Sequence, residues 1–374
     1  MLDTPPKKIL FVGSINPFFS GALAVKLRAK GHQVDSLSMY DLAKGSPERA
    51  CFSRSFSLLP SRSRLGLLLF GWLRFVVVWL RVVLGRYDLL HIHYATNPLA
   101  LALLAFVPGR NRFFISFYGS DIYRETEARK RFLAKRASKV WGVSCANEVT
   151  LAEVRELFSG NTGLSYYICR FGNSILNHLD VKSPHELFPN GRLRVAIGYN
   201  AASEQRHLEV LEAFSQWDGD KSQFEVLLQM TYGDSEGGAY TERVEDWLRR
   251  QGWKYKILKG YQSDDEIAKF RHESDIFVNV QPTDQFSNSL QENLYCKNIC
   301  IVGSWLPYET FKKQGLQLIE IDHVVDIPQE VDKMRQQAGQ VYSKMDCHPD
   351  VIRSFSGWEA CLETWLNAYS EVWK

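Results

Sequence analysis

The sequence predicts an α/β protein made of two doubly wound domains, each with a parallel sheet between two layers of helices. Two observations lead to this fold class. The chain has 374 residues, which is long for one domain and suits two of average size. Short apolar runs alternate with segments of helical periodicity through both halves of the chain, as expected for successive βαβ units.

The first alternating series fills residues 1–172. The run KILFVGS at residues 8–14 predicts a buried strand, and the helix that follows the turn INPFFS is stopped by Gly31. Further strands are predicted at QVDSLSM, YDLLHIH, FFISFYGSD and KVWGVS, with helical segments among them. We therefore expect one Rossmann-like domain over this range.

A second series begins after the polar segment 173–191, which we interpret as a linker. Its predicted strands are LRVAIGYN, FEVLLQM, YKILKG, DIFVNV and NICIVG, and they place a second Rossmann-like domain at residues 192–350. Residues 351–374 space their aromatic and aliphatic side chains at helical intervals, which predicts an amphipathic closing helix. Because ligands of such folds bind outside the carboxyl ends of the strands, we expect the chemistry in the cleft between the domains.

The composition is ordinary for a soluble globular protein, with 45% hydrophobic and 23% charged residues. The seven cysteines form no CxxC pair and no Cys/His cluster at zinc-ligand spacing, which argues against structural zinc and fits a reducing compartment. The N-terminal segment MLDTPPKKILFVGS lacks the charged and then apolar layout of a signal peptide. These features predict a cytoplasmic protein with no metal and no other cofactor.

Charge is distributed unevenly along the chain. Residues 1–140 contain 22 Lys and Arg against 8 Asp and Glu, a net charge of +14, and the remainder contains 23 against 34, a net charge of −11. Such asymmetry predicts that the N-terminal domain faces membrane headgroups, nucleic acid or phosphates, and a solvated basic face is the alternative. A nucleic-acid partner is disfavoured, because the basic residues do not interleave with aromatic ones as in a known binding module.

The apolar stretch RSRLGLLLFGWLRFVVVWLRVVLGR, residues 62–86, departs from the soluble pattern. Its length approaches the ~20 residues of a transmembrane helix. However, Arg74 and Arg81 lie seven residues apart on one face, and charge is costly at a bilayer centre. Flanking arginines and two tryptophans favour a helix lying in the headgroup plane of an anionic membrane. A core helix with its arginines extended to solvent is the alternative, and a true span is the third possibility.

The segment DQFSNSLQE, residues 284–292, lies between the predicted strand DIFVNV and a helix. Small residues in a strand-to-helix turn let backbone N–H groups at the helix N-terminus approach an anion closely. Asp284 lies at the mouth of the turn and Glu292 about one helical turn inside, and ionised carboxylates can accept the paired hydrogen bonds that adjacent sugar hydroxyls offer. The pattern by itself is also typical of a helix cap followed by a surface glutamate.

This segment resembles the signature of retaining GT-B glycosyltransferases, in particular the group 4 family. In that signature an acidic residue, seven intervening residues and a glutamate flank a Gly-Phe-Gly-Leu-like turn; here the first acid, the aromatic residue and the final glutamate match. The resemblance implies that Asp284 contacts hydroxyls of the transferred sugar and that Glu292 binds ribose hydroxyls. The turn residues Ser287, Asn288 and Ser289 depart from the glycines, and the resemblance implies that the amides of Asn288 and Ser289 hold the diphosphate. It also implies an interdomain cleft and a C-terminal helix that crosses back to the first domain.

In the N-terminal half, the segment ISFYGSDIY resembles the family's His-Gly or Tyr-Gly turn after a strand. The resemblance implies that Tyr118, Gly119 and Asp121 line the cleft, with Tyr118 and Asp121 near the reacting atoms and Gly119 on the acceptor side. Tyr118 stands where histidine is commoner. The loop GSINPFFSG is long enough to receive an acceptor, and Asn16 and Ser20 are its candidate contacts.

In the C-terminal half, the segment IGYNAASEQRHLEVLEAF carries a second departure from the family pattern. The family places an arginine just after the glycine and a lysine about seven residues on, and both neutralise the leaving diphosphate. Here Gly198, Tyr199 and Asn200 form the donor-side loop, and Tyr199 takes the arginine position. Arg206 is the candidate for the cationic role, which is often the largest contribution to catalysis, or else a solvated arginine at a helix start.

Other features carry less information. His91 and His93 alternate on a strand, so we expect them to face opposite sides as packed core histidines rather than to share a metal. The DGD triplet at 218–220 follows a helix in a polar linker and is interpreted as a turn. No GxGxxG or Walker A pattern occurs, which argues against a nicotinamide enzyme or an NTPase.

The sequence therefore predicts a glycosyltransferase that uses a nucleotide diphosphate sugar, acts with retention and without metal, and works at the inner membrane surface in polysaccharide or glycolipid assembly. The segments GYNAASEQRH and QMTYGDSEGGAY faintly resemble enterobacterial 4-acetamidofucose transferases, which favours a lipid-linked acceptor. Two alternatives remain open. One is a nucleotide-sugar 2-epimerase of the same fold, and the other is a catalytically degenerate protein that binds nucleotide sugars.

Overall fold

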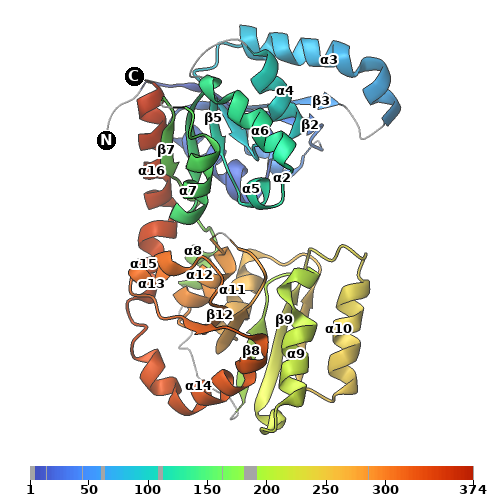
Figure 1. The fold of residues 1–374 in the computed structure, drawn as a ribbon, viewed down its shortest axis with the longest axis vertical. Helices are drawn as coiled ribbons and strands as arrows, with labels where there is room; N and C mark the ends of the chain where they lie inside the picture. The colour runs from blue at the N-terminus through green and yellow to red at the C-terminus, as the bar shows by residue number, and fades with distance from the viewer. Residues whose placement is uncertain are drawn as a thin grey trace. The chain divides into compact units, whose positions relative to one another are not determined.

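The chain folds into two compact units, which are drawn as one ribbon in Figure 1. Unit 1 comprises Met1–Gly172 together with Trp358–Lys374, and unit 2 comprises Asn173–Gly357. The computed structural model describes residues 5–13, 15–43, 45–59, 64–107, 113–161, 163–180, 192–284 and 286–373. Within these ranges, the side chains of residues 59, 64–72, 137 and 372 are outside the description.

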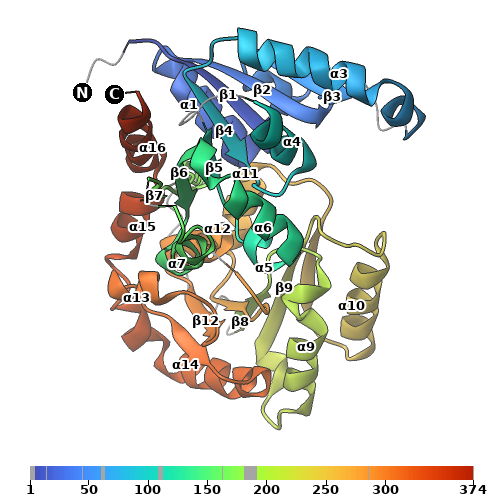
Figure 2. The same cartoon turned by 45° about the horizontal axis from the view of Figure 1, so that its top comes forward.

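Unit 1 is built on a seven-stranded, all-parallel sheet with the order β3-β2-β1-β4-β5-β6-β7 (Figure 2). Its strands are β1 (Lys8–Gly13), β2 (Gln33–Tyr40), β3 (Arg54–Leu59), β4 (Leu89–His93), β5 (Phe113–Ser116), β6 (Val140–Cys145) and β7 (Ser165–Ile168). Its helices are α1 (Ala22–Ala29), α2 (Pro47–Ala50), α3 (Arg64–Leu84), α4 (Pro98–Phe106), α5 (Ser120–Tyr123), α6 (Glu127–Lys135), α7 (Glu148–Leu157) and α16 (Trp358–Val372), with the π-helix η1 (Pro17–Gly21) before α1.

Alternate residues of the unit 1 strands enter two separate cores, as the two-residue period of a strand requires. On one face, Leu10 and Val12 of β1 join a core to which α3, α4, α6 and α7 contribute. On the other face, Ile9 and Phe11 join a core made with α1 and α16. A parallel sheet covered on both sides explains why these strands are continuous apolar runs in the sequence.

Unit 2 repeats this layout with a six-stranded, all-parallel sheet in the order β10-β9-β8-β11-β12-β13. Its strands are β8 (Leu193–Ile197), β9 (Phe224–Met230), β10 (Tyr255–Lys259), β11 (Ile276–Asn279), β12 (Ile299–Gly303) and β13 (Ile319–Ile321). Its helices are α8 (Leu176–Leu179), α9 (His207–Gln216), α10 (Ala239–Arg250), α11 (Asp264–His272), α12 (Asn288–Tyr295), α13 (Glu309–Lys313), α14 (Ile327–Tyr342) and α15 (His348–Ser356). One face packs against α9, α10 and α14, and the other against α8, α11, α12, α13 and α15.

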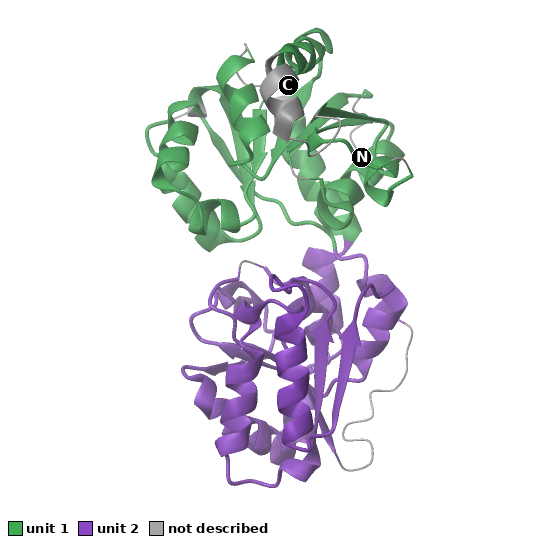
Figure 3. Cartoon of the chain, turned by 90° about the vertical axis from the view of Figure 1, so that its right-hand side faces the viewer, with its two compact units in different colours: residues 1–172, 358–374 green, residues 173–357 purple. Residues whose placement is uncertain are grey.

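The predicted fold class, two Rossmann-like domains with parallel sheets, is confirmed, and the boundaries need adjustment (Figure 3). Residues 173–180, which we interpreted as linker, belong to unit 2, where Leu176 and Leu179 of α8 are buried in the core. Residues 181–191 lie outside the described residues. The predicted helix 351–374 is two helices separated by Gly357, and only the second, α16, belongs to unit 1.

Within the stretch 62–86, residues 64–84 form the long helix α3, which runs beside the edge strand β3 (Figure 2), and residues 62 and 63 lie outside the described residues. Val78 and Val82 are buried in the unit 1 core, so this helix packs as part of the domain. No helix in the described part of the chain is both long enough and apolar enough to span a bilayer.

Candidate active site

The strand order places a topological switch point in the middle of each sheet. In unit 2 the order reverses between the neighbouring strands β8 and β11, and in unit 1 between β1 and β4. Loops that leave the carboxyl ends of two such strands diverge to opposite sides, which opens a crevice where ligands of this fold class bind. The candidate residues of unit 2 lie in the loop after β8 and in the loop and helix after β11.

Asp284 is held by two neutral donors at the carboxyl end of β11. Its Oδ2 accepts hydrogen bonds from Gln281 Nε2 at 2.7 Å and from the Tyr308 hydroxyl at 2.5 Å. The Tyr308 hydroxyl in turn accepts a hydrogen bond from Asn279 Nδ2 at 2.7 Å. Tyr308 therefore connects Asn279, at the end of β11, to Asp284 in the turn. Burial, and next to it the charge of Asp284, raises the pKa of Tyr308 well above its usual value, which keeps this hydroxyl a donor. These hydrogen bonds fix the orientation of the carboxylate.

Helix α12 begins immediately after this carboxylate, and its start has the chemistry of an anion site. Ser287 is the N-cap residue, and its side chain accepts a hydrogen bond from the Leu290 N–H at 3.1 Å. Asn288 and Ser289 are the first two residues of the helix, where backbone N–H groups have no acceptor within the helix. These N–H groups and the helix dipole attract negative charge at this end.

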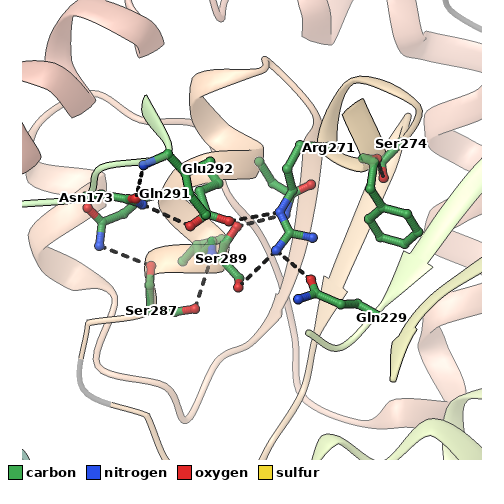
Figure 4. Close-up of polar contacts among 12 residues, drawn as sticks. Asn173, Gln229, Arg271, Ser274, Ser287, Ser289, Gln291 and Glu292 are labelled. Atoms are coloured by element: carbon green, nitrogen blue, oxygen red, sulfur yellow. Dashed lines mark hydrogen bonds and ion pairs between the residues drawn. The ribbon is translucent and has the colours of Figure 1, made fainter. Parts of the chain in front are cut away.

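Glu292 has a different set of partners from the ribose hydroxyls that we expected. Its Oε2 pairs with Arg271 Nε at 3.0 Å, and its Oε1 accepts from Asn173 Nδ2 at 3.0 Å. The side chains of Arg271 and Glu292 are 1% and 4% exposed, so this is a buried ion pair. Figure 4 shows Arg271 flanked by Glu292 on one side and by Gln229 on the other.

The buried ion pair also reaches the start of α12. Arg271 Nη2 donates to Ser289 Oγ at 3.2 Å and to Gln229 Oε1 at 2.8 Å (Figure 4). One guanidinium therefore connects α11, the end of β9 and the first turn of α12. It places a fixed positive charge under the turn that we expect to hold the diphosphate.

Both residues at which the chain enters and leaves unit 2 are tied to α12. Asn173 contacts Glu292, and the Ser356 hydroxyl hydrogen-bonds to Gln291 Oε1. The N–H of Asn173 also donates to the carbonyl of Ser356 at 2.9 Å. The first and last segments of unit 2 thus meet beside this helix.

The loop after β8 is shaped by Gly198, which has a φ of +64°, where a Cβ would approach His207 Nε2 to 2.8 Å. The N–H of Tyr199 donates to Gln205 Oε1 at 3.1 Å, and the Tyr199 hydroxyl lies 3.2 Å from Gln281 Oε1. Asn200 caps its own loop by accepting from the Ala202 N–H at 2.8 Å. Tyr199 is thus connected through Gln281 to Asp284, although it replaces the expected cation.

Arg206 lies at the edge of this network, where its Nη1 donates to the Val280 carbonyl at 3.5 Å. Its Nε donates to Glu209 Oε2 at 2.7 Å, and its guanidinium lies 5.8 Å from the centre of the Trp305 ring. The residue adopts a left-handed backbone conformation at the start of α9. Both arginines are thus paired with a carboxylate, Arg206 with Glu209 and Arg271 with Glu292, but Arg271 is the buried one and contacts Ser289 at the turn.

In unit 1, the expected residues gather at the switch point between β1 and β4. Gly13 ends β1 with a φ of +111°, and a Cβ there would lie 2.3 Å from the carbonyl oxygen of His93, so only glycine fits. Asp121 is fully buried and accepts from the N–H groups of Ala95 and Tyr118, at 3.0 and 2.8 Å. Burial raises the pKa of Asp121 to about 6, although these two hydrogen bonds act to lower it. Asp121 therefore fastens the loop after β4 to the loop after β5.

The Tyr118 hydroxyl lies 2.9 Å from His93 Nδ1, and its ring stacks on Phe171 with centroids 5.6 Å apart. The prediction that His91 and His93 face opposite sides is wrong, because residues two apart on a strand share a face. Their ring centroids are 3.9 Å apart. Both are fully buried, as predicted for packed histidines, and burial lowers the pKa of His93 to about 3. His93 therefore stays neutral and orients Tyr118.

The two acceptor candidates of the first loop are used locally. The Asn16 side chain accepts from the Phe18 N–H at 2.8 Å, which caps η1. Ser20 is fully buried, and its hydroxyl bonds to the Asn16 backbone. Gly119 has a φ of 92° at the start of α5, a conformation that suits glycine.

Sequence reasoning missed several residues of the unit 2 site. Gln281 carries a detectable signal, since a polar side chain at the carboxyl end of an apolar strand faces the ligand edge. Arg271, Gln205 and Asn173 carry none, because a polar residue on a helix or in a loop resembles a surface residue until its partners are known. Among the described residues no group of three or more His, Cys, Asp or Glu side chains is placed to hold a metal ion.

Comparison with known proteins agrees with this architecture. Residues 8–150 match the model of a family described as glycosyl transferase 4-like. A glycosyltransferase from Rickettsia africae ESF-5 is 14% identical, with a TM-score of 0.76 over 99% of this chain and 100% of that one. Anabaena HepE in complex with UDP and glucose is 12% identical, with a TM-score of 0.73 over 98% and 100% of the two chains.

Sucrose-phosphate synthase from Thermosynechococcus elongatus is 13% identical, with a TM-score of 0.69 over 98% of this chain and 99% of that one. Comparison with curated proteins by sequence gives no match. The likeness to these solved structures extends over nearly the whole chain and confirms the predicted fold.

Proposed function

We propose that this chain is a glycosyltransferase that transfers a sugar from a nucleotide diphosphate sugar to an acceptor at a membrane surface; the GT-B fold and the family match over residues 8–150 support the proposal. The observation that carries the proposal is the turn before α12. There a fixed carboxylate, Asp284, precedes two helix-terminal N–H groups that lie over the buried cation Arg271. The carboxylate suits sugar hydroxyls, and the N–H groups suit a diphosphate.

In this proposal the donor diphosphate lies at the N–H groups of Asn288 and Ser289, and Asp284 orients the sugar. The bond between the sugar C1 and the diphosphate oxygen breaks, and a bond forms between C1 and the acceptor oxygen on the same face. The acceptor proton passes to the departing phosphate oxygen, so configuration is retained and no protein nucleophile is needed. The N–H groups at the start of α12 stabilise the leaving group, Arg271 positions this turn through Ser289 while Glu292 balances its charge, and the proposed reaction needs no metal.

Glu292 enters the proposal through Arg271. The carboxylate of Glu292 neutralises and orients the Arg271 guanidinium, and it thereby fixes the position of this guanidinium next to Ser289. A ribose contact by the same carboxylate would use the lone pairs that Arg271 and Asn173 leave.

The donor site can be tested by removing one N–H group without disturbing the helix. Asn288 is the first residue of α12, where proline is tolerated, and Ser287 before it has φ −60° and ψ 119°, which a following proline accepts. We expect Asn288→Pro to weaken UDP binding at least tenfold, because a hydrogen bond to a charged group contributes about 1.5–3 kcal/mol. UDP is the probe because HepE is solved with it.

The matched control is Asn288→Ala, which removes the side chain and keeps the N–H. Thermal unfolding with and without UDP measures both variants, since a ligand at ~100 times its Kd stabilises by about 2.7 kcal/mol. Equal UDP shifts in the two variants would contradict the site. An assay with nucleotide sugar and no acceptor separates the alternatives, because an epimerase would convert the donor sugar and a degenerate protein would bind it without turnover.

The membrane part of the proposal rests on the outer face of α3. Leu73, Val77, Leu80 and Leu84 recur at intervals of four, three and four residues, and they are 62%, 50%, 41% and 73% exposed. We call these four residues the α3 stripe. Arg74 and Arg81 are exposed beside it. An apolar stripe bordered by arginines suits the boundary between headgroups and acyl chains of an anionic bilayer.

We expect Val77→Glu with Leu84→Glu to reduce binding to phosphatidylglycerol-containing vesicles more than tenfold, since each exposed aliphatic chain loses about 1.5–3 kcal/mol of burial. Arg74→Glu with Arg81→Glu should weaken vesicle binding, and the remaining binding should depend less on salt concentration. Vesicle sedimentation measures both. Val149→Glu, at a residue 48% exposed on α7, is the control for an added charge on unit 1. Binding that is unaffected by both double variants would exclude α3 as the contact.

A further inference from the structure

A second candidate site of unit 2 is connected to Asp284 through Gln281 and is not used by the donor chemistry above. It is an open pocket of about 580 Å³ between α9 and the loop after β13. Its wall includes Trp305, which follows β12 and is 39% exposed. The volume falls in the range of small-molecule sites, about 300–1,000 Å³.

The indole of Trp305 is held in place. Its Nε1 donates to the backbone carbonyl of Gln281 at 2.9 Å, and the Arg206 guanidinium lies 5.8 Å from the ring centre. An exposed aromatic ring that is fixed by a hydrogen bond loses little entropy when a ligand stacks on it. Part of this fixed aromatic ring therefore lines the pocket.

The polar groups around this ring decide which ligand fits. The lining carries three carboxylates, Glu209, Glu212 and Asp322, against one guanidinium, Arg206, which is already paired with Glu209. A surplus of negative charge repels a phosphate or a nucleotide. Carboxylates accept hydrogen bonds only, so Glu212 and Asp322 call for a ligand rich in donors. Both residues are exposed and can reach it.

A neutral saccharide meets these requirements. The C–H face of a pyranose ring is apolar and packs on an indole, and its hydroxyls donate to carboxylates. The pocket is also connected to the site of transfer, because Gln281, whose carbonyl holds Trp305, donates through its side chain to Asp284.

We infer that this pocket is a subsite for a neutral saccharide unit of the glycan acceptor, with Trp305 as the stacking surface and Glu212 and Asp322 as hydroxyl acceptors. The inference deepens the proposed function and rests on it. It assigns part of acceptor recognition to unit 2, whereas the sequence directed attention to Asn16 and Ser20 of unit 1.

The test is saturation-transfer NMR on the full chain with three neutral disaccharides, cellobiose, maltose and N,N′-diacetylchitobiose, each in a separate titration. We expect saturation transfer from the protein to at least one disaccharide. Binding of that disaccharide should be retained in Trp305→Phe and should be at least tenfold weaker in Trp305→Ala. Glu212→Ala changes an exposed residue of α9 that is outside the core, and it should weaken binding severalfold. Retention in Trp305→Phe shows that the ring, and not the indole hydrogen bond, makes the contact.

UDP thermal shifts on the same samples distinguish failure of the saccharide subsite from failure of the proposed donor site. A normal UDP shift without transfer to any disaccharide, or with equal transfer in wild type and Trp305→Ala, overturns the saccharide subsite alone. No UDP shift in wild type removes the proposed donor site. Transfer to spermidine in place of the disaccharides would also overturn the inference, since it would identify the carboxylates and Trp305 as a cation site.

Discussion

Replacement of Glu292 by alanine is expected to lower the free energy of unfolding of unit 2 by about 3–5 kcal/mol. The change leaves Arg271, which is 1% exposed, without its carboxylate, and an unpaired charge in the interior is far more costly than a missing surface contact. It also removes the acceptor of Asn173 at the entry to the unit. Urea denaturation followed by tryptophan fluorescence measures the loss.

Two further variants make this result specific. The pair Glu292→Leu with Arg271→Met removes both charges at similar volume, and it should recover most of the loss, as buried pairs often can be replaced by apolar residues. Glu330→Ala, which breaks the exposed pair with Lys333, should cost less than ~1 kcal/mol. A loss of the same small size in Glu292→Ala would mean that the pair is hydrated, and the account of a buried cation under α12 would fail. The same result explains why Glu292→Ala is a poor probe of donor binding.

The second large effect is expected at Trp365 of α16. Its side chain is fully buried, lies 5.2 Å from Phe171 and 5.3 Å from His91 between ring centres, and donates from Nε1 to the Arg170 carbonyl at 2.9 Å. Trp365→Ala opens a large cavity in the core between the sheet and α16, which should lower the unfolding free energy of unit 1 by about 3–5 kcal/mol.

Thermal and urea unfolding measure this loss, and Trp305→Ala provides the control of a tryptophan that is 39% exposed and packs less tightly. The control should cost about half as much or less. A change below ~1 kcal/mol in Trp365→Ala would show that α16 is dispensable for the fold of unit 1.

The parallel cores and the turn before α12 were predictable because they depend on local sequence. Continuous apolar strands, a polar residue after a strand and small residues before a helix are all visible in short windows. The edge strands β3, β7 and β13 were missed, because edge strands are covered less completely than central strands, and β7 and β13 are also short. Residues 54–59 in particular alternate polar and apolar residues beside a much stronger apolar helix.

The partners of the site residues were not predictable from local sequence. Arg271 and Glu292 are 21 residues apart, and nothing in either segment shows that both side chains turn into the interior. Asn173 and Glu292 are 119 residues apart, so their hydrogen bond depends on the whole topology of unit 2. The error on His91 and His93 was of another kind, since the two-residue period of a strand already places both rings on one face.

Unit 2 is an insertion in the chain of unit 1, because the segments before and after it both belong to unit 1, and its ends meet at Asn173 and Ser356. The ends of the insertion are hydrogen-bonded to each other, and Gly172 approaches Trp358 so closely that a Cβ on it would lie 2.8 Å from the Trp358 Cα. Insertions whose ends lie together can be excised with little strain on the host domain. Joining Gly172 to Trp358 through a short connector should therefore give unit 1 as a continuous polypeptide with α16 in place, and residues 173–357 can be produced separately. The two units can then be recombined as independent modules.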